Sequence, residues 1–332
     1  MISRGKGNPF LHQICSSTAV VGKFRYNWDL VAANVLFGAN FSCFVSLVRW
    51  VDFRALFLLQ VFAGALFFIP NALFSPRTYR IRRGDLGRIL AISVLVIYGW
   101  MYFILWGSTY TNPIDSAIIA TLGPTLTLVV DLLVNRNERL NGSRIVGLGA
   151  ASLGAWLLIF DEGFQLTRGT EGWGNLLIFC AVVAIATNTV LIKPTLERLG
   201  TRTVMGWYYF IGLMITYPFF RHFVHPEQLL RLPLMAKVEL GYILLIGTVW
   251  PMRLLYRGAE HLTAIHTALY RYIQPLIAGI LALLRHQARF DSTNLTALVL
   301  IFIGIVLTVI GYRRSLRAIR ESLAPRRFRQ KQ

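Results

Sequence analysis

The sequence predicts an all-α polytopic membrane protein with ten transmembrane helices, and three observations support this fold class. Of its 332 residues, 55% are hydrophobic and only 15% are charged, whereas soluble domains carry about 25% charged residues. The apolar residues gather into ten blocks of about 20 residues, the length that crosses about 30 Å of hydrocarbon. The second half of the chain also repeats features of the first half.

Each apolar block is predicted to be a helix, because backbone groups in lipid must find their hydrogen-bond partners within the segment. The first block follows residues 1–28, a predicted cytoplasmic segment without the pattern of a cleavable signal. The alternation typical of barrel strands is absent. The expected cores of the first five helices are Leu30–Val48, Leu56–Leu73, Leu86–Gly107, Ile114–Val134 and Ile145–Phe160.

The second set of five helices begins after a short acidic connection. Its expected cores are Gly174–Ile192, Val204–Phe223, Val238–Tyr256, Leu262–Leu284 and Leu295–Tyr312. The connections are roughly 5 to 15 residues long, which leaves no room for a soluble catalytic domain. We expect two five-helix units, at residues 29–160 and 174–312, and a basic cytoplasmic tail at residues 313–332.

The net charge is +19, and the Lys and Arg residues are distributed unequally between the connections on the two sides of the membrane. If the N-terminus is cytoplasmic, the connections on that side hold about three times as many Lys and Arg residues as those on the other, as the positive-inside rule requires. Both termini are then cytoplasmic, in what we expect to be a bacterial inner membrane. The charge is therefore interpreted as topological and lipid-binding, with no nucleic-acid partner.

Several function classes lack their sequence signals. Cys15, Cys43 and Cys180 lie far apart and show neither metal-ligand spacing nor a disulfide framework. No phosphate-binding glycine loop is present, which argues against an ATP-driven pump. The sequence thus predicts no cofactor and no metal site, and transport would draw on an ion gradient or on solute exchange.

An internal repeat relates the two halves. The segment Gly99–Pro124 aligns without a gap on Trp250–Pro275, and the alignment pairs Gly107 with Gly258 and Pro124 with Pro275. A unit of five helices makes the second copy start on the opposite side of the membrane. The two halves are then inverted, as in many secondary carriers, with the substrate site near mid-membrane between them.

These segments resemble the drug/metabolite transporter superfamily, in its EamA-like branch. The resemblance covers about Asp29 to Tyr312 and depends on four runs: FGANF, its echo AIATN, DSAIIATLGPTLTLVVDLL followed by NERL, and TALYRYIQPLIAGILALL. It implies an inverted five-plus-five repeat, with helices 1–4 and 6–9 around a cavity. The chain departs from the family pattern at Gln60, where arginine is frequent, at Ala288, where the glutamate is missing, and at Arg271, which aligns with Ala120.

Arg271 is the main candidate for substrate contact, because it lies near the middle of the ninth helix. An ionised side chain at that depth costs about 2.5–3.5 kcal/mol on insertion scales unless it meets water, a partner or a ligand. Gln274 shares its helical face. A structural ion pair with Asp131 or Asp115 is the alternative.

Helix 4 carries a similar stripe of small and polar residues, which ends at Asp131. Asp131 is a candidate proton or cation site if it is buried. Pro124 and Pro275 each remove one backbone hydrogen bond, so both are expected to kink their helices, or else only to shape packing.

Other polar and aromatic residues could complete the site. Asn40 and Asn188 occupy matching places in the repeat. Each is expected either to donate a hydrogen bond to a ligand or to form a hydrogen bond with another helix. Tyr102, Trp106 and Tyr270 are candidate cavity walls, with lipid-facing packing as the alternative.

The predicted function is movement of a small organic solute, anionic or zwitterionic, by alternating access. The partners would be the substrate, the lipid bilayer and a coupling proton or cation. Two non-transport alternatives remain open: an assembly partner, or a lipid-modifying enzyme, since His286 and Asp291 have the H-x4-D spacing of glycerolipid acyltransferases.

Overall fold

The computed structural model describes residues 9–75, 81, 83–135, 170–262, 264–286 and 295–304, with isolated positions at 142, 143, 146, 147, 149, 150, 153, 154, 157, 292, 306 and 307. All regular elements within these ranges are helical, which confirms the predicted fold class. Most of the predicted fifth helix and the whole of the basic tail lie outside the described residues.

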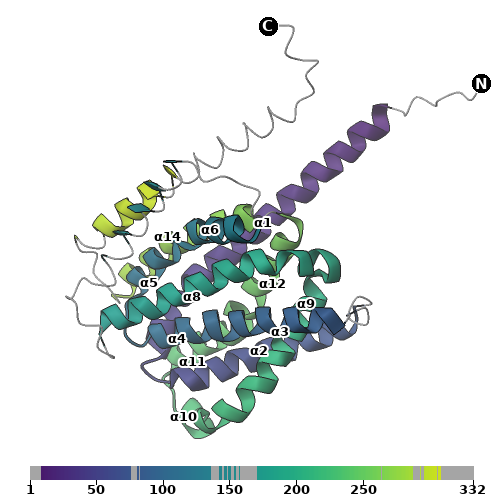
Figure 1. The fold of residues 1–332 in the computed structure, drawn as a ribbon. Coiled ribbons are helices and arrows are strands. Elements are labelled where there is room, and N and C mark those ends of the chain that lie inside the picture. The colour runs from purple at the N-terminus through teal and green to yellow at the C-terminus, as the bar shows by residue number, and fades with distance from the viewer. Residues whose placement is uncertain are drawn as a thin grey trace, which may run out of the picture.

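The first half forms an antiparallel set of helices that begins with a long α1 (Figure 1). Its elements are α1 (Pro9–Leu47), α2 (Phe53–Leu73), α3 (Arg83–Val96), the π-helix η2 (Ile97–Tyr102), α4 (Phe103–Gly107), α5 (Pro113–Ala120) and α6 (Gly123–Asn135). α1 projects beyond the other helices at its N-terminal end (Figure 1). We call the end of the bundle from which it projects the N-terminal face.

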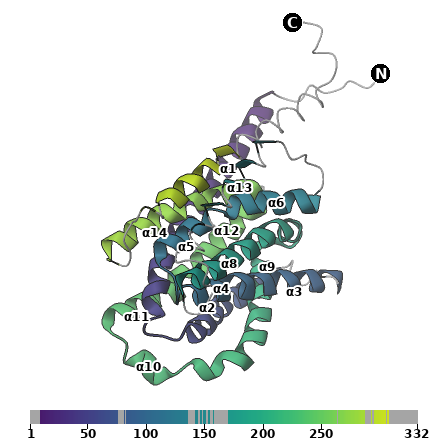
Figure 2. The same cartoon turned by 60° about the vertical axis from the view of Figure 1, so that its left-hand side comes forward.

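The second half repeats this arrangement from the opposite face. Its elements are α8 (Glu171–Leu191), α9 (Lys193–Phe220), η3 (Arg221–Phe223), α10 (Pro226–Leu230), α11 (Leu234–Gly241), the π-helix η4 (Tyr242–Gly247), α12 (Val249–His261), α13 (Ala264–Leu269), η5 (Tyr270–Tyr272) and α14 (Ile273–Leu284). Residues Leu295–Gly304 form a shorter apolar helix. α10 and α11 lie at the end opposite to the N-terminal face (Figure 2).

Seven helical runs in the described part of the chain are long and apolar enough to cross a membrane. α9 is not among them, because Trp207, Tyr208, Tyr209 and Tyr217 lower its mean hydropathy. It nevertheless occupies the place of the predicted seventh helix, packed against α2 and α12.

Local sequence sets several helix starts. Asp52, Asn112 and Thr170 each accept a hydrogen bond from a backbone N–H in the first turn of α2, α5 and α8, which is the usual role of these residue types at an N-cap. The Arg54 side chain bonds to Asp52 and lowers the pKa of its carboxyl group. The cap therefore stays ionised at neutral pH.

α9 starts eleven residues before the predicted core, at Lys193 instead of Val204. Gly200 interrupts it with φ 77° and ψ 158°, a backbone conformation that L residues with a side chain rarely adopt. The short segment before Gly200 therefore runs in a different direction from the membrane-length segment that follows.

The helix contacts are symmetric between the halves. α1 packs against α12 and α14 of the second half, and α8 packs correspondingly against α4 and α6 of the first. α2 and α9, the two second helices, pack against each other. Exchange of the halves therefore maps these contacts onto one another, as an inverted repeat requires.

Two close contacts make this symmetry explicit at atomic scale. A Cβ at Gly258 would lie 2.5 Å from a Leu30 side-chain carbon, and a Cβ at Gly107 would lie 2.8 Å from one of Ile178. Gly107 aligns with Gly258 in the repeat, and the spacing between Leu30 and Ile178 equals that between Asn40 and Asn188. The two contacts are therefore equivalent and lie at opposite ends of the bundle.

Candidate functional site

The two halves enclose a small central cavity of about 30 Å³, room for about one water molecule. It lies between α1, the helices of the third and fourth spans, α8, α12 and the ninth span. The residues around it are Asn34, Phe37, Phe41, Phe44, Trp100, Ile104, Ala120, Val182, Ile185, Leu255, Arg271 and Gln274. Its walls are mainly apolar, and the polar groups come from two helices only.

Arg271 contributes the charge of the cavity and is 4% exposed. Its Nη2 donates to Oγ1 of Thr189 at 2.9 Å, while its buried Nη1 has no hydrogen-bond partner among the described residues. No carboxylate in the described ranges lies within 4 Å of the guanidinium, so neither Asp115 nor Asp131 forms the alternative ion pair with it. Among the described residues, the guanidinium thus has a hydroxyl as its hydrogen-bond partner, and the cavity around it is mainly apolar.

Gly123 makes room for this guanidinium. A Cβ at position 123 would lie 3.0 Å from Nη1 and 3.1 Å from Cδ of Arg271. The close approach holds α6 against the ninth span, with which it also packs through α13.

Gln274 is the second polar group and belongs to a chain of hydrogen bonds. Its Nε2 donates to Oδ1 of Asn34 at 2.6 Å, and Nδ2 of Asn34 donates to the Leu30 carbonyl at 2.7 Å. This chain joins helix 9 to helix 1 across the two halves. Arg271 and Gln274 therefore lie together in the cavity, on the shared helical face that the sequence indicates.

Asn40 and Asn188 take different partners despite their matching places. Nδ2 of Asn40 donates to the Gly247 carbonyl at 2.8 Å. The Asn40 side chain also lines a neighbouring cavity of about 20 Å³, together with Gln60. Nδ2 of Asn188 donates to the Tyr256 hydroxyl at 2.9 Å. Both residues bond between helices in this conformation, and Asn188 lies next to Thr189, the partner of Arg271.

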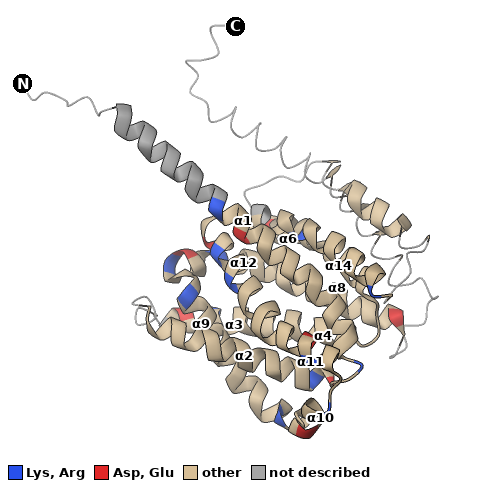
Figure 3. Cartoon of the chain, turned by 180° about the vertical axis from the view of Figure 1, so that it is seen from behind, with Lys and Arg blue, Asp and Glu red and all other residues tan. Residues whose placement is uncertain are grey.

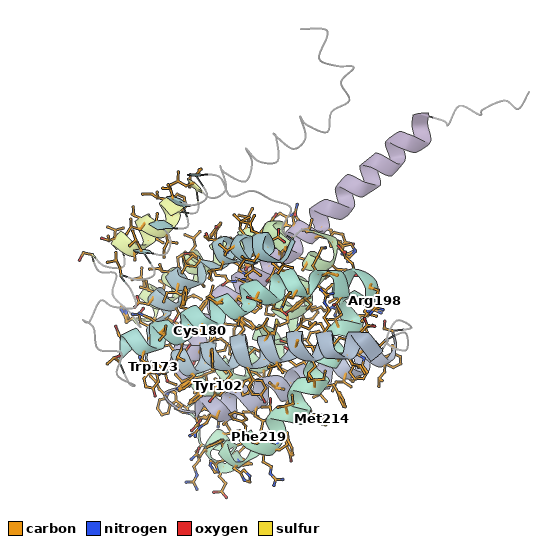
Figure 4. The ribbon with its side chains drawn as sticks, in the orientation of Figure 1. Tyr102, Trp173, Cys180, Arg198, Met214 and Phe219 are labelled. Atoms are coloured by element: carbon orange, nitrogen blue, oxygen red, sulfur yellow. The ribbon has the colours of Figure 1, made fainter. Side chains whose placement is uncertain are left out.

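The structure does not bring the other predicted wall residues to the cavity. Tyr102 and Trp106 belong to an aromatic cluster with Phe53 and Phe57, and Trp106 also contacts Trp173. Figure 4 shows Tyr102 and Trp173 at the end of the bundle opposite to that of Arg198. Tyr270 is half-buried but does not line either central cavity.

Two aspartates on helix 4 also lie away from the cavity lining. Asp131 is half-buried near the end of α6, on the N-terminal side of the bundle. Asp115 is buried at the start of α5, where it accepts a hydrogen bond from Nδ2 of Asn175 at 3.2 Å. Asn175 is also bonded by Thr111, so this network links the two halves at the opposite face.

Both fourth helices of the repeat are interrupted shortly before their prolines. α5 ends at Ala120 and α6 starts at Gly123, next to Pro124. In the ninth span, the 3-10 segment Tyr270–Tyr272 separates α13 from α14, which contains Pro275. Arg271 lies inside this interruption, so its side chain projects from an irregular turn.

The sequence-based interpretation missed Asn34 and Trp100 of the cavity lining, and Thr189, the hydrogen-bond partner of Arg271. Asn34 and Thr189 are polar residues within predicted spans, and a polar residue at that depth is itself a signal of a functional site. Trp100 packs edge-on against Phe37 with ring centroids 5.4 Å apart. It lies in the π-helical turn η2, and aromatic residues on both faces of this helix hide which face is inward.

Two further predictions concern chemistry. Within the residues that the structure describes, no group of three or more His, Cys, Asp or Glu side chains could hold a metal ion. His286 lies two residues after the end of α14 and has φ 51°. Asp291 lies outside the described residues, so the H-x4-D pair has no observed geometry.

Several curated relatives are named as transporters. The chain is 22% identical over 302 residues to the "Uncharacterized inner membrane transporter YicL" of Salmonella typhimurium, covering 87% of this chain and 97% of the relative. It is 21% identical over 259 residues to the "Uncharacterized transporter YetK" of Bacillus subtilis, covering 75% and 77%. An "Uncharacterized transporter" of Archaeoglobus fulgidus is 25% identical over 196 residues, covering 58% and 66%.

A solved crystal structure shares the fold. It superposes with a TM-score of 0.60 at 16% identity, covering 86% of this chain and 97% of the other chain. The EamA-like transporter family matches at residues 28–160 and again at 172–310. The double match agrees with the two inverted halves and with the position of the cavity between them, and the chain belongs to the EamA-like transporter family.

Proposed function

We propose that this membrane transporter moves a small organic anion or zwitterion by alternating access, as a secondary carrier. The observation that supports this most is the Arg271 guanidinium, which lines the cavity between the halves without a carboxylate partner among the described residues. A buried charge is costly unless it is paired, and a substrate carboxylate would supply the pair. Asn34 and Gln274 offer polar contacts beside it.

The small volume of the cavity supports a change of conformation. About 30 Å³ holds no organic metabolite, so the halves must separate before a substrate can bind. Inverted repeats allow this by rocking about a central site. The interlocked contacts at both ends of the bundle, such as Gly258 with Leu30 and Gly107 with Ile178, then open in turn.

Asp131 is our candidate for the coupling group. It lies two helical turns after Gly123 and one after Thr127, in the same helix as the glycine that contacts Arg271. Coupling to a proton or cation gradient, or exchange of solutes, would drive transport. Asn40 and Asn188 are proposed to exchange their present bonds for substrate when the cavity opens.

The proposed location is a bacterial inner membrane with both termini in the cytoplasm. Support comes from the distribution of Lys and Arg between the two faces, and the Salmonella relative is named an inner membrane transporter. Labelling of single cysteines at the two ends of the chain with an impermeant reagent checks this orientation. Labelling from outside the cell at either end would contradict it.

Transport by Arg271 variants tests the proposed function. Purified protein in proteoliposomes would be screened for uptake of labelled amino acids and organic acids, with and without a proton gradient. Arg271→Ala is expected to abolish uptake, and Arg271→Lys to retain part of it, because lysine keeps the charge but not the planar fork. Arg231→Ala, an exposed arginine at the opposite face, is the control and should transport normally.

The same assay separates binding from coupling. Asp131→Asn is expected to lose gradient-driven uptake and to keep solute exchange, because the protonated form is mimicked permanently. Arg271→Ala with unchanged kinetics would contradict the role of Arg271. Unchanged gradient dependence in Asp131→Asn would exclude Asp131 as the coupling group.

A further inference from the structure

A second and larger cavity opens at the N-terminal face and plays no part in the proposed site. Its volume is about 370 Å³. Four elements form its walls: the start of the α1 span, the end of α2, the region around Gly200 in α9, and the end of α12. We call it the vestibule.

The vestibule is strongly cationic. Arg25, Arg202, Arg253 and Arg257 line it, and Glu260 is the acidic residue that accompanies them. Figure 3 shows basic segments of α1, α9 and α12 gathered at this end of the bundle. The arginines come from three different helices, so their convergence is a property of the fold and not of one basic segment.

The two carboxylates near the vestibule, those of Asp29 and Glu260, both have hydrogen-bond partners. Arg257 forms an ion pair with Asp29, with Nε donating to Oδ2 at 2.7 Å. One Glu260 oxygen accepts from the backbone N–H and the hydroxyl of Thr201, at 2.9 and 2.6 Å. Arg25, Arg202 and Arg253 have no ion pair with a carboxylate of the described ranges. An excess of positive charge therefore faces the same recess.

Arg253 is held in place by aromatic rings. Its guanidinium carbon lies 5.6 Å from the ring centroid of Trp250 and 5.9 Å from that of Phe67, within the range of cation–π contacts. This position keeps the cation at the wall of the recess instead of in open solvent. Asn71 and Ser75 also line the vestibule and add neutral polar groups.

Aromatic side chains separate the vestibule from the central cavities. Phe68 lines the vestibule, whereas Tyr209 lines the small cavity beside Asn40. The two rings stack at 5.0 Å with an interplanar angle of 9°, and both are at most 2% exposed. A ligand in the vestibule is therefore distinct from a substrate at Arg271.

We propose that the vestibule is an anion-binding site for a phosphate or carboxylate group, held by Arg202 and Arg253. Unpaired arginines that converge on a polar recess favour such oxyanions, which accept bidentate hydrogen bonds from guanidinium groups. The group can belong to a soluble anion or to the headgroup of an anionic lipid, because the recess opens at the face where headgroups lie. This inference goes beyond the proposed function, since binding here can be measured without transport.

Thermal unfolding of the purified full-length protein tests the site and identifies the source of the anion. One arm adds inorganic phosphate, against chloride at equal ionic strength, to protein in phosphatidylcholine nanodiscs. The other arm replaces part of the phosphatidylcholine with phosphatidylglycerol. A saturating anion is expected to raise the midpoint by about 2 to 5 °C, because it binds the folded state only.

Matched variants assign the effect to the vestibule. Arg202→Gln combined with Arg253→Gln should lose the shift, whereas Arg88→Gln combined with Arg231→Gln removes the same charge from exposed positions outside it and should keep it. A shift with phosphate indicates a soluble anion, and a shift with phosphatidylglycerol alone indicates a headgroup. The proposal is overturned if neither arm separates the wild-type protein from the Arg202/Arg253 variant.

A second measurement does not depend on the stability of any variant. Phenylglyoxal modifies accessible arginines, and mass spectrometry of the wild-type protein reports each position. Phosphate or phosphatidylglycerol should protect Arg202 and Arg253 and leave Arg88 unprotected; equal protection at all three positions would contradict the site. Arg271→Ala should retain this protection. The test of the vestibule is therefore independent of whether Arg271 binds the transported substrate.

Discussion

At the scale of single residues, Arg271 depends on a neighbour that has no side chain. Gly123 is buried against the guanidinium, and any Cβ there would come within 3.0 Å of Nη1. Such a distance is shorter than a normal non-bonded contact, so the guanidinium would have to move. The position of the charge in the cavity is therefore set by helix 4 as much as by helix 9.

Gly123→Ala is expected to lower transport on the order of tenfold, because a small misplacement of a binding group has a large effect on rate. Gly279→Ala is the control: it lies in α14, also in the ninth span, and its Cβ would meet nothing within 4 Å. Both substitutions favour the helix equally. Equal transport rates for the two variants in proteoliposomes would show that Gly123 does not position Arg271.

The sequence points to some of the residues that line this cavity. Arg271 and Gln274 were identifiable because a charge and an amide at helical spacing are rare inside a span. Aromatic chemistry alone favours Tyr102 and Trp106, but the aromatic side chain of the third span that lines the cavity is Trp100. Residue type alone does not give the rotation of a helix that is aromatic on both faces, and the π-helical turn from Ile97 to Tyr102 changes that rotation further.

At the scale of the elements, an asparagine of one helix supplies a hydrogen bond that a proline of another helix cannot. Pro251 has no N–H, so it cannot donate to the Gly247 carbonyl one turn earlier. Asn40 of α1 donates to that carbonyl instead, at 2.8 Å. The start of α12 is thus completed by a side chain of the other half.

Asn40→Ala is expected to lower the free energy of unfolding by about 1–3 kcal/mol, the cost of an unsatisfied buried polar group. In the Pro251→Ala background the backbone N–H returns, so the same change at Asn40 should cost less. Thermal or denaturant unfolding of the four proteins gives the coupling. Asn71→Ala is the control, because its side chain bonds the Phe67 carbonyl within a single helix; strictly additive effects of Asn40 and Pro251 would contradict the compensation.

The helices themselves are largely predictable, whereas the early start of α9 and its break are not. Apolar blocks of span length identify α2 or α8 to within a few residues, because hydrophobic length is fixed by the bilayer. The early start of α9 and its break at Gly200 depend on a short polar helix whose sequence resembles a connection. The interruptions before Pro124 and Pro275 adjoin Ala120 and include Arg271, whose carbonyls would accept from positions 124 and 275, where proline has no N–H.

At the scale of the whole molecule, the inverted repeat makes the two ends of the bundle equivalent and opposed. The contact between Leu30 and Gly258 lies toward the N-terminal face, and the contact between Ile178 and Gly107 lies toward the opposite face. If the halves rock about the cavity, each contact must open while the other stays closed. Locking either one should therefore stop the cycle in a different state.

Cysteine pairs at these two contacts test alternating access directly. In a background without Cys15, Cys43 and Cys180, the pairs 30/258 and 107/178 should each cross-link on oxidation, since a Cβ at either glycine would lie within 3 Å of the partner's side-chain atoms. Oxidation should abolish transport in both, and reduction should restore it, while variants with a single cysteine at position 30 or 178 keep transporting after oxidation. The locked pairs should also differ in which face admits an impermeant reagent to a cysteine at position 274, next to Arg271. Full transport by either cross-linked protein would mean that the solute moves without separation of these helices, and the rocking mechanism would have to be abandoned.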